Sequence, residues 1–419
     1  MSIFPSWVWG NLDLTQEPFA VVFGADLGAP ENVSEALAGL LADGEDVVSE
    51  RSSNRTLSFT VMVEGGDHEQ LADFEALLHR EAEKARNTLA VTPGDGFGAT
   101  TVFDTFRASL KKVTSDAGER QFVRRYEVEM QALPYPRSAR RDEPVALSPV
   151  VGKLVTGTVE AEGTARTTAD LTLSIGHNGT SGPPAAGVVH TSSRPGGIIP
   201  VTAYAATPTT AASHTPSGLT AEASPSAPAV FEVPVSVFSG PDSSEGHALY
   251  VFGSGLHSSA SWNVTVQPFA ASAGLTPFPV QSGSLRSTNG VLGIFSLPGA
   301  VVGAGGWVRV ALAPSSGTAT VLGVFAVNVE HGALTIAVAR SRVWVQGGAL
   351  PPHLPRVLTS TGDDISVAQG VTPSAQGRHD LVPGTNYVSA VSNASVGGPG
   401  SMVVSYEPRW HTHARSPQP

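Results

Sequence analysis

The chain has 419 residues, which at about 150 residues per domain predicts two or three domains. Its 45 glycines and 32 prolines favour short strands joined by turns over long helices, and the absence of cysteine excludes disulfides, thiolate metal sites and cysteine nucleophiles. The formal net charge of −11 is uneven, because residues 1–143 hold 24 acidic and 14 basic side chains against 12 and 11 in residues 144–419. This change predicts a domain boundary near residue 143.

The first residues, MSIFPSWVWG, lack the basic and apolar segments of a signal peptide, and no run of about 18 apolar residues occurs in the sequence. We therefore expect a soluble protein that does not insert into membranes. Trp7 and Trp9 are expected to anchor a short strand in the first domain or in a neighbouring molecule.

The periodicity of the sequence changes between residues 55 and 85. Apolar and polar side chains alternate over residues 55–63, which predicts a half-buried strand. After two glycines, Asp67 can cap a helix, with Gln70 three residues further on. Apolar residues from Leu71 to Ala85 then recur at helical spacing, which predicts an amphipathic helix of about five turns.

Three more strands complete the predicted first domain. They are expected at residues 88–92, 101–113 and 120–133, and the last two should form an antiparallel hairpin with one solvated face. Residues 1–143 are therefore predicted to be α+β, a strand-rich sandwich or barrel with one packed helix. The predicted core of this domain consists of Leu57, Phe59, Val61, Leu71, Phe74, Leu78, Phe122, Tyr126 and Val128.

Beyond residue 144 the sequence alternates without a convincing amphipathic helix, so this half is predicted to be all-β. Two β-sandwich domains are expected, residues 144–272 and 273–419. The stretches LYV…SWNVTVQP and NYV…SMVVSYEP resemble one another, which indicates an internal duplication, with chance similarity as the alternative. Residues 203–229 lack periodicity and are predicted to be a long loop or linker.

No motif for catalysis, nucleotide binding or metal binding occurs in the chain, so we predict no catalytic residues, no metal site and no cofactor. His411 and His413 have metal-ligand spacing but lie in a polar tail, where solvated histidines are more common. Trp307, Trp344 and Trp410 are candidates for glycan contact, because aromatic rings pack on sugars. Their place in or beside alternating strands favours a core role instead.

Several residues follow one another in a recognisable order within residues 51–136. An arginine opens a strand, a helix with leucines follows, then a TLAVT strand, a turn and a long hairpin that ends in Ala-Leu-Pro. This order resembles the N-terminal domain of siphophage distal tail and minor tail proteins, especially those of phages of actinobacteria. The stretches DLVPGTNYV and YEPRW are similar to the closing strands of such proteins. The matching residues are Arg55, Leu57, Leu71, Leu77, Leu78, Leu89, Val91, Ala132, Leu133 and Pro134.

The resemblance implies a structural virion protein of the tail tip, made in the host cytoplasm. Family N-terminal domains assemble into a ring, usually a hexamer, that joins the tail tube and the tape measure protein to the baseplate hub. Their C-terminal sandwiches, galectin-like or jelly-roll in type, carry receptor-binding or other minor tail proteins or touch host-surface glycans. This chain departs from the family by a β-rich half nearly twice as long as its first domain.

The acidic first domain has two interpretations. An acidic channel would let DNA pass without binding it, because it offers no release of counterions, and we expect no sequence-specific nucleic-acid binding. Alternatively, the acidity only keeps the protein soluble. The alternative to a tail-tip protein is a carbohydrate-binding or adhesin-like β-sandwich protein without catalytic activity. An enzyme is disfavoured because the β half offers few acidic residues for a catalytic carboxylate pair.

Overall fold

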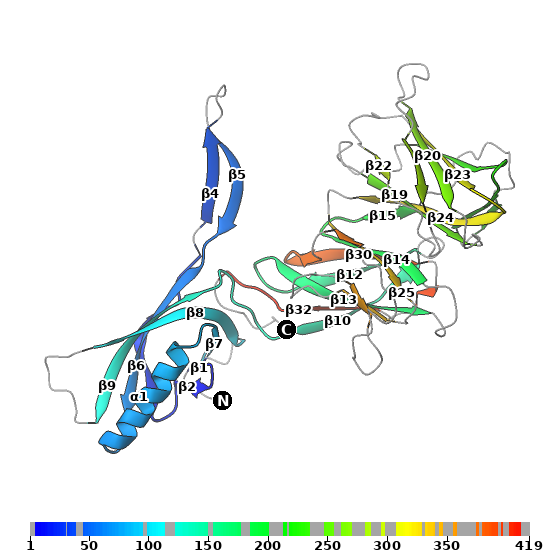
Figure 1. The fold of residues 1–419 in the computed structure, drawn as a ribbon. Helices are drawn as coiled ribbons and strands as arrows, with labels where there is room; N and C mark the ends of the chain where they lie inside the picture. The colour runs from blue at the N-terminus through cyan, green and yellow to red at the C-terminus, as the bar shows by residue number, and fades with distance from the viewer. Residues whose placement is uncertain are drawn as a thin grey trace. The chain divides into compact units, whose positions relative to one another are not determined.

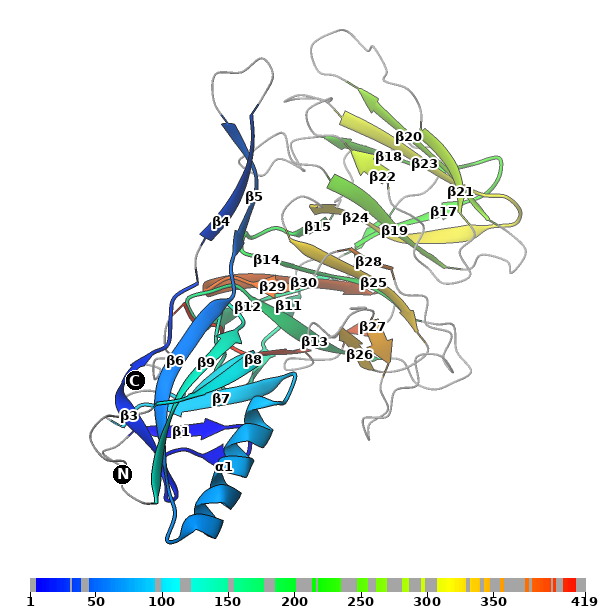
Figure 2. The same cartoon turned by 60° about the vertical axis from the view of Figure 1, so that its left-hand side comes forward.

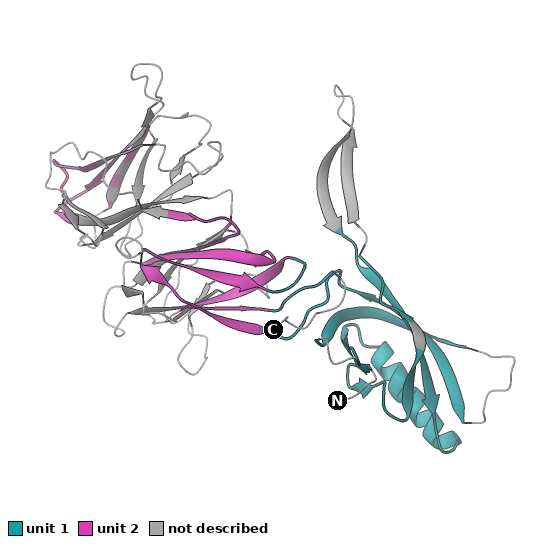
Figure 3. Cartoon of the chain, turned by 180° about the vertical axis from the view of Figure 1, so that it is seen from behind, with its two compact units in different colours: residues 1–140, 162–165, 407–419 teal, residues 141–161, 166–406 magenta. Residues whose placement is uncertain are grey.

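The chain forms two compact units (Figure 3). Unit 1 comprises Met1–Arg140, Glu162–Ala165 and Glu407–Pro419, and unit 2 comprises Arg141–Ala161 and Arg166–Tyr406. The first division falls beside the predicted boundary at residue 143, but the return of the chain's last residues to unit 1 was not predicted. This computed structural model describes residues 5–30, 32–38, 45–94, 99–113, 122–149, 154–176, 185–200, 213–215, 218–234, 247–254, 261–269, 281–285, 295–297, 307–328, 332–339, 343–346, 355–357, 374–376, 379–392, 395–396 and 402–411.

An antiparallel sheet of seven strands, in the order β2-β1-β7-β8-β9-β6-β3, forms unit 1 (Figure 1). The four strands predicted between residues 55 and 133 are confirmed as β6, β7, β8 and β9, and β8 pairs with β9 as the predicted hairpin. The strands are β1 Ser6–Trp9, β2 Leu12–Asp13, β3 Phe19–Asp26, β6 Arg55–Glu64, β7 Asn87–Thr92, β8 Thr101–Lys112 and β9 Val123–Ala132.

One helix, α1 (His68–Ala82), packs against this sheet (Figure 2). The predicted cap is confirmed, because the Asp67 carboxylate accepts a hydrogen bond of 2.8 Å from the Gln70 backbone N–H. The helix ends at Ala82, earlier than predicted. The Asn87 side chain donates to the Glu81 carbonyl oxygen at 3.3 Å and to the Glu81 carboxylate at 2.8 Å, which turns the chain into β7.

The core of unit 1 lies between α1 and the sheet. Seven of the nine predicted core residues are buried there, and Phe74 is partly buried against them. Phe122 lies outside this cluster, just before β9, and its ring meets that of His68 at 5.0 Å between centroids. The sequence did not predict that Arg55 is buried too. The buried apolar cluster is Trp7, Trp9, Leu14, Phe19, Leu57, Phe59, Val61, Val63, Leu71, Leu78, Leu89, Val91, Phe103, Tyr126, Val128, Met130 and Ala132.

A separate two-stranded sheet is formed by β4 (Asn32–Ala38) and β5 (Glu45–Ser52). The two strands are antiparallel, with an irregularity between Glu35 and Ala36. Among the described strands, neither β4 nor β5 pairs with any other. This ribbon of two strands was not predicted.

Unit 2 is built from strands, which confirms the prediction of a mainly β half. One sheet has the order β10-β32-β13-β26-β27, with β29 and β31 also on β13, and another has the order β11-β12-β30-β14-β25-β28. Their strands are β10 Arg141–Val145, β11 Ser148–Pro149, β12 Leu154–Ala161, β13 Thr167–Gly176, β14 Ala185–Ser192, β25 Ala333–Ala339, β26 Val343–Gln346, β27 Pro355–Val357, β28 Ser374–Gln376, β29 Asp380–Leu381, β30 Gly384–Ser392, β31 Ser395–Val396 and β32 Met402–Tyr406.

Two further sheets of unit 2 use only the strands between β14 and β25. One has the order β16-β17-β24-β19-β22, with β15 on β24, and the other has the order β18-β23-β20-β21. Their strands are β15 Ile198–Pro200, β16 Ser213–Thr215, β17 Gly218–Ala223, β18 Ala229–Pro234, β19 His247–Ser254, β20 Trp262–Phe269, β21 Gln281–Leu285, β22 Phe295–Leu297, β23 Trp307–Pro314 and β24 Ala319–Asn328.

This pairing corrects the expected succession of two sandwiches, residues 144–272 and 273–419. β20 pairs with β21 and β23 across residue 272, while β14 pairs with β25 and β30 much later in the chain. The second group of strands is therefore an insertion within the first. Alternation identifies a strand but not its partner, which explains the error. The proposed duplication stays a prediction.

The expected loop at residues 203–229 is wrong in part. β16, β17 and the first residue of β18 lie within it, and β17 pairs with β24. Residues 218–223 do alternate, as Leu219, Ala221 and Ala223 fall between polar neighbours, but their small side chains gave a weak signal. Residues 203–212 lie outside the described residues.

Candidate functional site

Strand β8 of unit 1 contains a β-bulge with a residue in the left-handed region. The pairing of β8 with β9 shifts register between Phe106 and Ser109. Within the bulge, Arg107 has a φ of 53°. A non-glycine residue in this left-handed region costs roughly 1–3 kcal/mol, and such residues cluster at functional sites. Bulges also redirect side chains, so Arg107 marks a candidate site.

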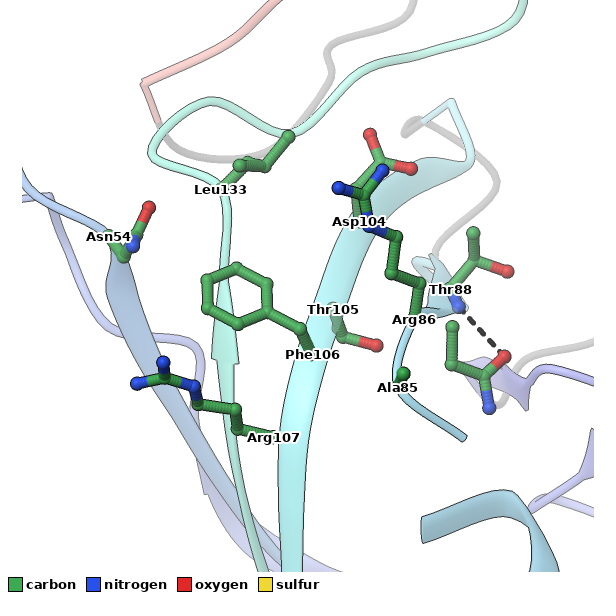
Figure 4. Close-up of a pocket in the computed structure, with 10 residues that line it drawn as sticks. Asn54, Ala85, Arg86, Thr88, Asp104, Thr105, Phe106, Arg107 and Leu133 are labelled. Atoms are coloured by element: carbon green, nitrogen blue, oxygen red, sulfur yellow. Dashed lines mark hydrogen bonds between the residues drawn. The ribbon is translucent and has the colours of Figure 1, made fainter. Parts of the chain in front are cut away.

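An open pocket of about 720 Å³ lies beside this bulge. Figure 4 shows its lining, with Arg86 and Arg107 on either side of Phe106 in this view and Leu133 beyond the ring. Leu133 is 39% exposed, and among the described residues it is the one large apolar side chain that is exposed. The lining residues are Asn54, Ala85, Arg86, Asn87, Thr88, Asp104, Thr105, Phe106, Arg107 and Leu133.

The charges at the pocket are unequally paired. Asp104 accepts hydrogen bonds from Arg137, at 3.0 Å from Nε and 3.1 Å from Nη2, and Arg137 Nη1 donates to Glu407 at 3.0 Å. These contacts, led by Asp104, raise the pKa of Arg137. Arg86 and Arg107 are exposed and make no hydrogen bond or ion pair with any residue that the structure describes. The pocket therefore holds two uncommitted cations.

Arg55, which follows Asn54 of the pocket lining in sequence, is only 2% exposed. Its guanidinium donates to the carbonyl oxygens of Pro134, at 2.9 and 2.5 Å, and of His411, at 2.8 Å, and more weakly to that of Leu27, at 3.5 Å. It also lies 5.6 Å from the centre of the Phe103 ring. Burial lowers the pKa of Arg55. One buried cation thus joins distant segments of unit 1 through its fork of donors.

Trp410, a predicted glycan-contacting residue, lies in the C-terminal segment that Arg55 binds through His411. It is 8% exposed, its indole N–H donates to Ser138 Oγ at 3.3 Å and its backbone N–H donates to the Pro136 carbonyl at 3.0 Å. The next residue, His411, donates its backbone N–H to Thr164 Oγ1 at 2.7 Å. The ring of Trp410 is packed within unit 1, so it does not offer the free face that sugar stacking needs, and the core interpretation is correct for this residue.

The other two candidate residues are less defined. Trp307 begins β23 and Trp344 lies in β26, but their side chains are outside the described residues. Their contact with glycan stays a prediction. His413 also lies outside the described residues. Within the described ranges no group of three or more His, Cys, Asp or Glu side chains could hold a metal ion, and no helix is long and apolar enough to cross a membrane.

Unit 2 contains a buried pair of histidines. His190, in β14, and His379 are each 1% exposed, and His379 Nδ1 lies 2.6 Å from Thr191 Oγ1. Burial, and secondarily the neighbouring His190, lowers the pKa of His379 to about 3. Gly197 and Gly332 pack on the His190 ring so closely that a Cβ there would lie 2.1 and 2.5 Å from ring atoms. The pair therefore lies beside the points where the chain leaves the first group of sheets of unit 2, near Gly197, and returns to it, near Gly332. No sequence motif indicated it.

The sequence matches no family model and no curated protein. Among solved structures, the Dit protein of SPP1, described as a paradigm of the hub adsorption apparatus of phages that infect Gram-positive bacteria, is 10% identical. The match covers 97% of this chain and 98% of that one, with a TM-score of 0.37.

Two other solved structures are similar over less of the chain. The baseplate of phage p2 in its activated conformation with Sr is 8% identical, covering 76% of this chain and 97% of that one, with a TM-score of 0.26. The VP2 subviral particle of infectious bursal disease virus is 11% identical, covering 67% and 82%, with a TM-score of 0.18. Phage hub and baseplate proteins are thus among the structural neighbours. At these scores the likenesses carry no argument about this chain.

Proposed function

We propose that this chain is a structural protein of a phage tail tip. The observation that carries the proposal is the arrangement of unit 1. The strand, helix, strand and hairpin whose order resembles distal tail proteins are β6, α1, β7, β8 and β9, and the strands among them lie in one sheet over one shared core. The segments that carry the resemblance in sequence therefore also fold together as one unit.

In the proposed role, unit 1 forms a ring, a hexamer by analogy with the family, that joins the tail tube and tape measure protein to the baseplate hub. Unit 2 points outward and contacts receptor-binding or other minor tail proteins, or host-surface glycan. The excess of acidic residues in the first third of the chain supports a channel wall that repels DNA. The protein is then a component of the virion tail.

Negative-stain imaging of the purified protein tests the proposal. We expect closed rings with a central opening, together with a sedimentation coefficient far above that of a 43.1 kDa monomer. A protein that remains monomeric at tens of micromolar and binds a glycan array would refute the ring and favour the adhesin-like alternative. Antibody labelling of phage particles would then distinguish a tail-tip position from any other.

A further inference from the structure

We propose that the pocket beside the β8 bulge binds the acidic segment of residues 31–50 of a second copy of this chain. The inference deepens the proposed function and rests on it, because it names the contact between neighbouring copies in the ring. Both sides of the proposed contact, a cationic pocket and an acidic two-stranded ribbon, belong to unit 1.

The pocket has the chemistry of a receptor for carboxylates. Arg86 and Arg107 are exposed and uncommitted among the described residues, while the one carboxylate of the lining, Asp104, is held by Arg137. Guanidinium groups bind carboxylates through two parallel hydrogen bonds. Phe106 and Leu133 add an apolar surface between and beyond these cations. A partner should therefore combine acidic and apolar side chains.

The segment of residues 31–50 has this complementary composition. It contains six carboxylates, three leucines and no lysine or arginine. Its strands β4 and β5 pair with each other and with no other described strand. An isolated two-stranded hairpin is at best marginally stable in water, so such a ribbon gains from contact with another surface. The same chain thus supplies the partner that the pocket requires.

The conformation of Arg107 supports a binding role for this position. A glycine would adopt a φ of 53° without strain, and yet the chain keeps an arginine there. The bulge turns this side chain out of the regular alternation of β8, and it lines the pocket instead of a strand face. The strain is offset if the guanidinium gains an anionic partner on assembly.

A charge-exchange experiment on the full chain tests the proposal. One variant reverses the pocket, R86E/R107E, and a second reverses the segment with lysine at Glu35, Glu45, Asp46 and Glu50. Each variant alone should associate at least about tenfold more weakly than the wild type for each charge pair lost. In the equimolar mixture, each pocket meets a segment of opposite charge, so association should return. Sedimentation velocity and negative-stain imaging measure both effects.

The controls separate this contact from general charge and from folding. R125E reverses an exposed arginine of β9 outside the pocket and should leave association unchanged. Circular dichroism must show wild-type structure for each variant. If R86E/R107E assembles like the wild type, or if the mixture of folded variants stays dissociated, the inference is wrong while wild-type rings leave the proposed function standing. A wild-type protein that never self-associates removes both.

Discussion

Acidification should weaken the sheet of unit 2 that contains β14 and β30, because His379 is buried beside it. The imidazole is buried, and its pKa in the folded chain is about 3, below the ordinary value of 6.5. Between pH 3 and 6.5, His379 is protonated in the unfolded chain but neutral in the folded chain. The stabilising effect of the neutral ring is therefore complete above pH 6.5 and is lost as the pH falls toward 3.

The size of this effect follows from the pH range between the two pKa values of His379. Each pH unit below 6.5 changes the free energy of unfolding by about 1.4 kcal/mol per proton, so at pH 5 the loss is about 2 kcal/mol. Hydrogen–deuterium exchange of the amides in β14 and β30, corrected for the intrinsic effect of pH, reports the local opening free energy. His379→Asn keeps a polar atom near Thr191 Oγ1 and removes the titration.

We expect the opening free energy of the wild type to fall between pH 6.5 and 5, and that of the variant to fall by about 2 kcal/mol less, because it lacks the titrating imidazole. His190 also contributes to the lowered pKa of His379, so His190→Asn in the same background measures how much of the pH dependence comes from this neighbour. Equal slopes for the wild type and the His379→Asn variant would refute the reasoning.

Three substitutions in unit 1 test other contacts. Asp67→Ala removes the cap of α1 and should lower the free energy of unfolding by about 1 kcal/mol in urea titrations; no change would mean that the cap contributes nothing. Arg55→Met leaves buried carbonyl oxygens unpaired, at about 1–3 kcal/mol each, and should release the C-terminal segment to proteolysis; a resistant variant would argue against this closure. Arg107→Gly relieves strain of roughly 1–3 kcal/mol, so the melting temperature should rise or stay level while self-association weakens; a lower melting temperature would contradict the strain.

Local features of the sequence predicted local structure. The alternation in β6 and the Asp67 cap correctly indicated a strand followed by a helix, because both depend on neighbours within a few residues. The bulge was not indicated in this way. The apolar residues of 101–110 are Val102, Phe103, Phe106, Ala108 and Leu110, and because even positions are apolar both before and after the bulge, they show no clear change of phase.

The nesting of strands and the buried charges could not be read in this way. β14 and β30 are neighbours in one sheet although nearly two hundred residues separate them. Arg55 is surrounded by carbonyl oxygens from segments remote in sequence, and nothing near it in the sequence indicates that they converge. Arg86 could not be identified as a candidate site residue from the sequence, because it shares a pocket with Phe106 and Arg107 only in the folded chain.

The return of Glu407–Pro419 to unit 1 has a consequence for the order of synthesis. The ribosome completes the seven-stranded sheet early, but the carbonyl oxygen of His411 reaches Arg55 only after unit 2 has been made. Until then Arg55 lacks one of its acceptors and Trp410 is not yet in place. Unit 1 should therefore acquire its full stability only after unit 2 has been synthesised, and this delay would hold back its assembly with other copies until that point.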